Sequence, residues 1–179
     1  MTVSRGRIFD FSTYLQKTLR ARGEATVWRW ADVQAALAGK DHDANGTLAL
    51  ADGNASDPAT IAPGLSLVIQ VVQAGDHTRP HSHSFWHLYL VRSGSGTARM
   101  GAKQTAHRIV SGDTLFVPAW CSHAIENIDG IEPLTLLRLQ NLPQTASLGA
   151  LSRDEGGSLQ HLYDEIASSK IAESAEASE

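Results

Sequence analysis

Two stretches decide how this sequence folds: residues 75–94, GDHTRPHSHSFWHLYLVRSG, and residues 112–127, GDTLFVPAWCSHAIEN. Between them they hold five histidines, and four of these, His81, His83, His87 and His123, form the pattern that matters here. Successive strand residues point to opposite faces, so His81, His83 and His87 share one face if the segment is extended. Neutral imidazole is a common ligand for transition metals. The spacing therefore predicts a metal site on a strand face, and a cluster of buried core histidines is the alternative.

Short apolar runs surround the two stretches from residue 64 onward. Turn signals such as AGD, SGSG and SGD separate these runs. The predicted strands cover residues 65–73, 85–92, 96–100, 105–110, 114–119, 123–128 and 133–142. Many short strands at turn-length spacing are typical of a sandwich or barrel of antiparallel strands. The fold class predicted from this pattern is all-β.

Short helices are expected at both ends of the chain. Residues 8–22 and 28–37 have apolar residues near helical spacing, and glycines follow both segments. A short strand is predicted at 47–51, within a segment rich in Asp, Gly, Asn and Pro. Residues 158–167 read as a last amphipathic helix, and the small, polar, acidic tail after them is expected to be disordered.

These elements divide the chain into three parts. Residues 1–63 form an N-terminal helical arm and loop, residues 64–143 a β-barrel, and residues 144–179 a C-terminal helix and tail. Because no internal repeat is visible, we expect one barrel.

Composition excludes several classes of function. The chain has 179 residues, 42% of them hydrophobic, and a net charge of -4 without a long basic run, which argues against a nucleic-acid partner. No apolar stretch is long enough to span a membrane, and the first residues lack the apolar core of a signal peptide. The single cysteine, Cys121, permits no internal disulfide, so a cytoplasmic location is expected.

The spacing of the two stretches resembles the paired motifs of the cupin superfamily, G-x5-H-x-H-x3-4-E-x6-G and G-x5-P-x-G-x2-H-x3-N. Every spacing matches, from Gly75 to Gly94 and from Gly112 to Asn127. Two identities differ, since His87 stands where the family has Glu and Trp120 where it has Gly. The resemblance implies a double-stranded β-helix, or jelly-roll, barrel whose mouth holds the metal.

A longer similarity, over residues 28–149, is to one cupin half of gentisate-type ring-cleaving dioxygenases. It rests on WRWADV, GLSLVIQVVQAGDHTRPHSH, FVPAWCSH and EPLTLLRLQNLP. Enzymes of that group hold Fe(II) with three histidines and cleave hydroxylated aromatic acids with O2. The resemblance implies that His81, His83 and His123 are ligands and that Fe(II) is the metal, with Ni, Mn, Cu or Zn as alternatives.

The chain departs from that group at three points. It has one cupin half where the family usually has two, and it has no acidic residue near Arg138 on the closing strand. His87 occupies a position that is usually small, and the HSHxxxH spacing looks like small cupins with four-histidine sites. As a ligand, His87 would leave only two open positions on an octahedral metal. If His87 is instead a labile ligand or a base beside the metal, three positions on the metal stay open. Three positions are enough for a chelating substrate and O2.

Other residues are candidates for the pocket. Arg79 shares parity with His81 and could clamp a carboxylate, although a surface salt bridge is the alternative. Tyr89 shares parity with His87, with a plain core aromatic as the alternative, and Arg138 lies on one face of the closing strand, with a position at the barrel rim as the alternative. We predict catalytic roles for these three residues. Side chains predicted to line the substrate pocket are Trp86, Trp120 and Gln140.

The sequence therefore predicts a metal-dependent dioxygenase that acts on a small hydroxylated aromatic acid or related anion with O2. A metal-dependent isomerase, cyclase or lyase that uses no O2 is the first alternative. A metal- or ligand-binding subunit without turnover is the second. A homodimer or higher homo-oligomer is expected, with no membrane partner.

Overall fold

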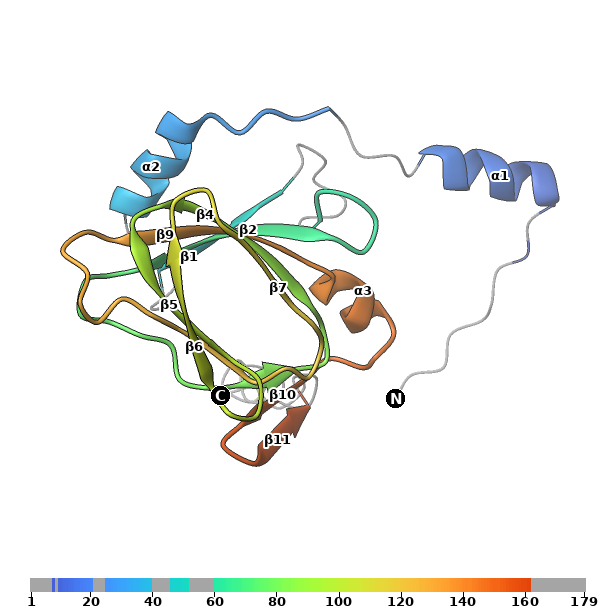
Figure 1. Ribbon diagram of the computed structural model, residues 1–179. Helices are drawn as coiled ribbons and strands as arrows, with labels where there is room; N and C mark the ends of the chain where they lie inside the picture. Colours follow the sequence, from blue (N-terminus) through green and yellow to red (C-terminus); the bar gives the residue numbers. More distant parts are fainter. Residues whose placement is uncertain (1–7, 9, 21–24, 40–45, 52–59, 162–179) are drawn as a thin grey trace, which may run out of the picture.

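The computed structural model describes residues 8, 10–20, 25–39, 46–51 and 60–161 (Figure 1). Within these ranges most elements are strands, as predicted. The three helices are α1 (Phe11–Arg20), α2 (Trp30–Ala38) and α3 (Leu142–Ser147). The strands are β1 (Thr47–Leu50), β2 (Ser66–Val72), β3 (Ser82–His83), β4 (His87–Ser93), β5 (Ser95–Met100), β6 (Thr105–Val110), β7 (Thr114–Val117), β8 (His123–Glu126), β9 (Leu134–Gln140), β10 (Ser152–Glu155) and β11 (Ser158–His161).

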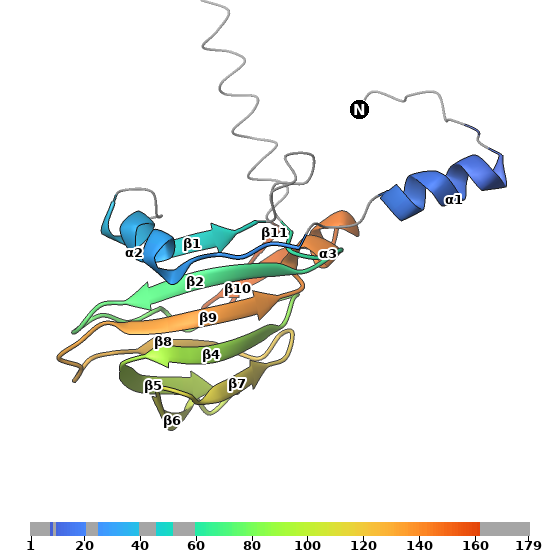
Figure 2. The same cartoon turned by 90° about the horizontal axis from the view of Figure 1, so that it is seen from above.

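A five-stranded antiparallel sheet in the order β1-β2-β9-β4-β7 forms one layer of the barrel. Strand β9 comes last of the five in sequence but lies at the centre, between β2 and β4, as Figure 2 shows. Its register pairs Arg138 with Val68 on one side and with Tyr89 on the other. The closing strand therefore carries its alternate side chains into the same interior as β2 and β4.

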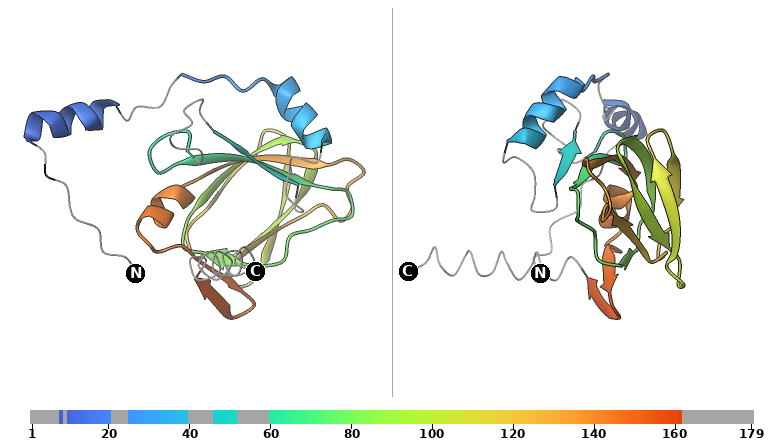
Figure 3. Two further views of the ribbon diagram at one scale, coloured as in Figure 1. Left: turned by 180° about the vertical axis from the view of Figure 1, so that it is seen from behind. Right: turned by 60° about the vertical axis from the view of Figure 1, so that its left-hand side comes forward.

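The second layer consists of β6, β5 and β8, and the segment before β4 continues it. Single bridges join His77 to Glu126 and His81 to His123, and β3 then pairs with β10. The core between the two layers is apolar and contains residues of both, from Val72, Tyr89 and Val91 to Ala98, Ile109 and Ile125. Figure 3 shows the strands enclosing this interior, with the β10–β11 hairpin on the opposite side from α2. The architecture confirms the predicted jelly-roll barrel.

The glycines of both motifs lie at turns that require positive φ. Gly75, Gly94 and Gly112 have φ values of 82°, 81° and 95°. At Gly94 the chain also passes so close to the next layer that a Cβ atom would lie 2.5 Å from the carbonyl oxygen of Pro133. Only glycine satisfies both conditions, because other residues would meet backbone there.

Asn127, the last residue of the second motif, holds two loops together at one end of the barrel. Its Nδ2 donates to the carbonyl oxygens of Val72, at 3.0 Å, and of Glu132, at 2.9 Å. Its backbone accepts from Gly75 and donates to Asp76. The side chain is only 1% exposed, so this asparagine is part of the fold rather than of the metal cluster.

The prediction of a helix at 158–167 is wrong for residues 158–161. Ser158–His161 is strand β11, which pairs with β10 in a hairpin. Gly156 and Gly157 both have positive φ, which gives the tight two-residue turn that a hairpin needs. Residues 162–167 and the predicted disordered tail lie outside the described residues.

The sheets extend beyond the predicted barrel range on both sides. Strand β1 joins β2 from within the predicted arm, and β10 joins β3 from within the predicted C-terminal part. Strand β10 is fixed by Ser84, whose amide donates to the carbonyl oxygen of Ser152 and whose hydroxyl accepts from the amide of Ser152. Strand β3 lies in the HxH segment whose extended form the histidine spacing predicts, whereas β10 was not predicted.

The N-terminal helices form close to the predicted ranges. Asp10 precedes α1 and accepts from the amide of Thr13, the N-cap geometry expected for an aspartate. Helix α2 ends at Gly39, whose amide donates to the carbonyl oxygen of Ala35. Among the described helices, none is long and apolar enough to cross a membrane.

Candidate metal centre

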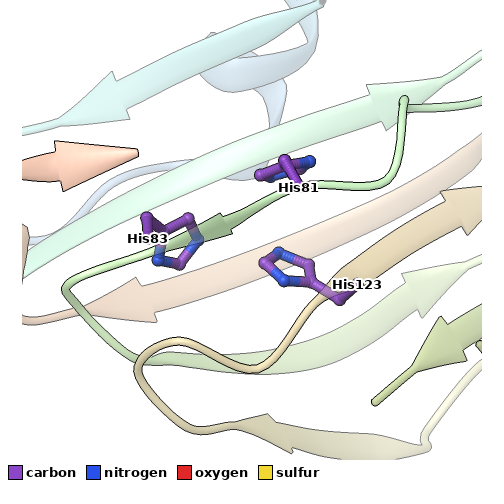
Figure 4. A group of neighbouring side chains, drawn as sticks. All are labelled: His81, His83 and His123. Atoms are coloured by element: carbon purple, nitrogen blue, oxygen red, sulfur yellow. The ribbon is translucent and has the colours of Figure 1, made fainter. Parts of the chain in front are cut away.

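Three histidines converge between the two layers of the barrel (Figure 4). His81 precedes β3, His83 lies in β3, and His123 begins β8. Reciprocal backbone hydrogen bonds of 3.1 and 2.9 Å between His81 and His123 hold the two segments side by side. One ring nitrogen of each histidine lies within 4.8 Å of the other two. The two sequence motifs thus meet in space as their resemblance implies.

Backbone carbonyl groups fix the orientation of each ring. Nδ1 of His81 lies 2.7 Å from the carbonyl oxygen of Arg79, Nδ1 of His83 lies 2.6 Å from that of Phe85, and Nδ1 of His123 lies 2.9 Å from that of Cys121. Because a carbonyl oxygen only accepts, each Nδ1 carries the proton. Each Nε2 is then a free lone pair, the arrangement that metal-binding histidines need.

The Nε2 atoms of His83 and His123 are buried and have no hydrogen-bond partner within the described chain. The two side chains are 3% and 1% exposed. An unpaired buried nitrogen is costly, so both atoms are suited to a bound ligand. The donor set consists of three neutral imidazoles, each oriented by the hydrogen bond from its Nδ1. Such a set fits a transition metal.

Burial keeps the cluster neutral. Burial, and then the neighbouring histidines, lower the pKa of His83 to about 3 and that of His123 to about 4. The pKa of His81 is also lowered, mainly by burial. Neutral imidazole is the form that binds a metal, so the rings are ready for one near neutral pH.

His87 lies next to the cluster but outside it. Its ring centroid is 4.3 Å from that of His83 and 5.5 Å from that of His123, yet no nitrogen of His87 belongs to the group of close ligand atoms. The ring is 1% exposed and its Nδ1 has no partner within the described residues. Burial, and then the charge of Arg138, lower its pKa strongly.

Arg138 brings a positive charge toward the histidines. Its charge lowers the pKa of His81, His83, His87 and His123. Its Nη1 donates to Gln70 Oε1 at 3.3 Å, and its Nε is buried without a partner in the described chain. The salt bridges among described residues join other pairs, Arg99 with Glu126 and Arg153 with Glu155. Arg138 therefore has neutral partners only.

Tyr89 and Gln70 flank this guanidinium. Tyr89 is the cross-strand neighbour of Arg138, and burial raises the pKa of its hydroxyl, although Arg138 opposes the rise by donating to it. Gln70 is 5% exposed and sits in the apolar run LSLVIQVV. The sequence reasoning missed Gln70, and a lone amide at an inward position of an apolar strand was the available signal.

The remaining predicted residues occupy different surroundings. Gln140 is buried beside His87 in the strand register, and its Oε1 has no partner among the described residues. Arg79 is exposed at the rim. Trp86 packs against Phe116, with ring centroids 6.1 Å apart, and Trp120 is 52% exposed. Neither tryptophan lines a described cavity, and their role as pocket walls stays a prediction.

A cavity of about 580 Å³ reaches the cluster from outside. It is polar, and His81, Arg138, Gln70 and Arg79 contribute to its wall, together with the Arg153–Glu155 pair. A second cavity of about 610 Å³ lies between α2 and the strand ends, and none of the predicted site residues lines it. The first cavity is large enough for a small aromatic acid and gives it access to both His81 and Arg138.

Comparison with known proteins agrees with this geometry. Residues 68–138 match the family model described as the cupin domain. The salicylate 1,2-dioxygenase of Pseudaminobacter salicylatoxidans superposes with a TM-score of 0.70 and 19% identity, covering 84% of this chain and 46% of that chain. Another structure of that enzyme, described as its adducts with gentisate, superposes with a TM-score of 0.63 and 17% identity. The match covers 73% of this chain and 37% of that chain.

These similarities show the fold. The chain spans less than half the length of the salicylate dioxygenases it matches. No protein of curated function is significantly similar to the sequence.

Proposed function

We propose, from the premise that residues 68–138 form a cupin domain, that this chain is an Fe(II)-dependent dioxygenase. Its substrate would be a small hydroxylated aromatic acid or related anion. His81, His83 and His123 would hold the metal. When bound, the metal supplies the Lewis acidity and redox chemistry that allow O2 to react with a phenol.

The observation that carries the proposal is the position of Arg138. This half-buried arginine, whose Nε is buried and which pairs with no carboxylate among the described residues, shares one cavity with His81. An isolated buried cation is unfavourable unless an anion joins it. Three neutral imidazoles also leave the charge of a bound metal uncompensated. Both effects favour an anionic ligand in the cavity.

The chain's own residues would orient such a substrate. Arg138 would pair with the carboxylate, held in place by Gln70 at 3.3 Å. Tyr89, whose raised pKa keeps its hydroxyl protonated, would remain a neutral neighbour of that guanidinium. The apolar core beneath the cluster would exclude water from the reacting ring.

The role of His87 distinguishes two versions of the site, one in which it is a ligand and one in which it is not. With His87 outside the cluster, three positions on an octahedral metal stay open, enough for a bidentate phenol–carboxylate and O2. We favour this version because the ligand atoms of the other three histidines are already close together without it.

An oxygen-electrode panel tests the proposal. The protein is reconstituted with Fe(II) under anaerobic conditions and assayed with gentisate, salicylate, catechol and a diketone. We expect O2 uptake with the aromatic acids and much less with catechol, which lacks the carboxylate for Arg138. If stoichiometric iron is bound and no compound drives uptake, the dioxygenase proposal fails and an O2-independent reaction or a binding role takes its place.

A further inference from the structure

A second arginine, Arg153 in strand β10, lies on the same face of its sheet as one of the clustered histidines. The register pairs Arg153 with His83 of β3. Residues that lie directly opposite each other in antiparallel strands point to the same face. Because the side chain of His83 points into the barrel and is only 3% exposed, that of Arg153 leaves its strand on the side of the cluster. Glu155, two residues further along β10, shares this face.

The guanidinium of Arg153 is held at the wall of the cavity of about 580 Å³ that reaches the cluster. Its Nη2 donates to Oε1 of Glu155, whereas its Nε is buried without a partner among the described residues. Burial lowers the pKa of His81 and of His123 most, and the charge of Arg153 contributes to lowering both. Arg153 is therefore close enough for its charge to act on the cluster, and it keeps an unused donor.

Two arginines thus reach one cavity from different strands. Arg138 comes from β9 in the five-stranded sheet, and Arg153 comes from β10, which pairs with β3. Both line the same cavity as His81. A guanidinium group binds a carboxylate by strong, charge-assisted hydrogen bonds. A ligand with a single carboxylate can satisfy one of these arginines and leaves the donor of the other unused.

The charge balance of the cavity wall also favours a ligand with two carboxylates. Apart from histidines, its ionisable side chains are three arginines and two carboxylates, which are Arg79, Arg138, Arg153, Asp76 and Glu155. They leave an excess of one positive charge, and Fe(II) would add two more. A salicylate bound through phenolate and carboxylate brings two negative charges, so one positive charge stays uncompensated. A second carboxylate on the ring balances it.

We propose that Arg153 is a substrate-binding residue and that the substrate is a hydroxylated aromatic acid with a second carboxylate. Arg138 binds the carboxylate beside the phenol, and Arg153 binds the second carboxylate through its free Nε. Glu155 holds the guanidinium of Arg153 at the cavity wall and competes with that second carboxylate for it. This inference rests on the proposed function, because it names the class of acid that enters the same cavity.

Equilibrium binding tests the proposal without turnover. The Fe(II)-loaded protein is titrated in a calorimeter under anaerobic conditions with two pairs of salicylates. Within each pair, a hydroxyl is exchanged for a carboxylate at one ring position. The first pair is gentisate and the hydroxyisophthalate whose second carboxylate replaces the second hydroxyl of gentisate. The second pair is beta-resorcylate and hydroxyterephthalate. In at least one pair we expect the dicarboxylate to bind about tenfold more tightly, the value of one hydrogen bond to a charged group.

Two substitutions in the same ion pair should have opposite effects. Arg153→Gln should nearly abolish the preference for the dicarboxylate, because the second carboxylate loses its charged donor. Glu155→Gln should increase that preference by roughly two- to fivefold, because the competing carboxylate is removed. Arg99→Gln is the matched control and should leave the preference unchanged. Arg99 is also paired with a glutamate and is 41% exposed, against 39% for Arg153, but it does not line the cavity.

Two results would overturn the inference. One is equal binding of both members in both pairs. The other is a loss of preference in Arg153→Gln and Glu155→Gln alike, which would give the ion pair a purely structural role. The proposed function is judged separately by O2 uptake. Uptake with gentisate but no preference for a dicarboxylate contradicts this inference alone. A preference that depends on Arg153, without O2 uptake from any ligand, supports the binding role and contradicts the dioxygenase.

Discussion

The three clustered histidines differ from the fourth in what holds each ring. His81, His83 and His123 each have Nδ1 against a carbonyl oxygen, whereas Nδ1 of His87 is buried and has no partner among the described residues. A metal-binding ring needs the hydrogen bond that fixes its tautomer. The local geometry therefore divides four histidines of similar sequence spacing into three candidate ligands and one neighbour.

Single alanine substitutions test this division. We expect His83→Ala and His123→Ala to weaken metal binding by more than about 100-fold, since loss of an outer hydrogen-bond partner alone costs roughly 10- to 100-fold. His87→Ala should retain close to the wild-type metal content. Metal per chain is measured by mass spectrometry after dialysis. A metal-free His87→Ala protein that is still folded would make His87 a fourth ligand.

Arg138 is expected to bind the carboxylate of anionic substrates. In Arg138→Gln the kcat/KM for an aromatic acid should fall roughly 10- to 100-fold, the value of a hydrogen bond to a charged group. Metal content should not change. Arg99→Gln is the matched control, because Arg99 is already paired with Glu126 at 2.6 Å. An equal loss in both variants would assign the effect to general charge rather than to Arg138.

The backbone conformation at Trp120 explains why the cupin motif has glycine at this position. Its φ is 63°, a left-handed conformation that costs an ordinary residue about 1–2 kcal/mol. We expect Trp120→Gly to be more stable than Trp120→Ala by about 1 kcal/mol, because both lose the indole and only alanine keeps the strain. Ala119, whose φ is not positive, should show the opposite order: Ala119→Gly destabilises. Chemical denaturation measures all of these, and equal stability of the two Trp120 variants would refute the explanation.

Among the elements, the loops after β2 and β8 depend on one side chain. Asn127 donates to the carbonyl oxygens of Val72 and Glu132 in the interior. Asn127→Ala should lower the free energy of unfolding by about 2–3 kcal/mol, because two buried acceptors lose their donor. Glu132→Ala should have little effect, since the bond uses the backbone of Glu132. Thermal unfolding compares the two, and a stable Asn127→Ala protein would contradict this role.

Strands that follow one another as short runs between turn signals could be predicted from the sequence, and those without such boundaries could not. Strand β6 has the predicted bounds, Thr105–Val110, and the predicted 65–73 differs from β2 by one residue at each end. Strand β3 has only two residues, and β10 pairs not only with its neighbour β11 but also with β3, which is distant in sequence. Residues 158–161 have helical spacing, but the Gly156–Gly157 turn overrides it.

The candidate site was predictable where spacing alone fixes it. The HxH pair and His123 were expected together and lie together. The strand parity of Arg138 gave its face but left the rim as an alternative, and the structure shows a half-buried side chain whose Nε is buried. The contact of Arg138 with Gln70 joins strands 68 residues apart, which no local pattern reveals.

For the whole molecule, the two faces of the five-stranded sheet differ. The inner face carries Tyr89, Arg138 and Gln140 toward the histidines, and the outer face carries Leu88 and Leu90, which are 37% and 41% exposed. Alternation along each strand separates the two faces, so a substitution on the outer face need not disturb the side chains around the histidines.

Incorporation of oxygen from 18O2 tests the dioxygenase proposal most directly. The Fe(II)-reconstituted protein is given an aromatic acid that drives O2 uptake, and the product is weighed by mass spectrometry. We predict a ring-opened product that carries two heavy oxygen atoms, one O2 consumed for each substrate. A product without heavy oxygen, formed by protein with stoichiometric metal, would contradict the proposal and establish a reaction that does not use O2.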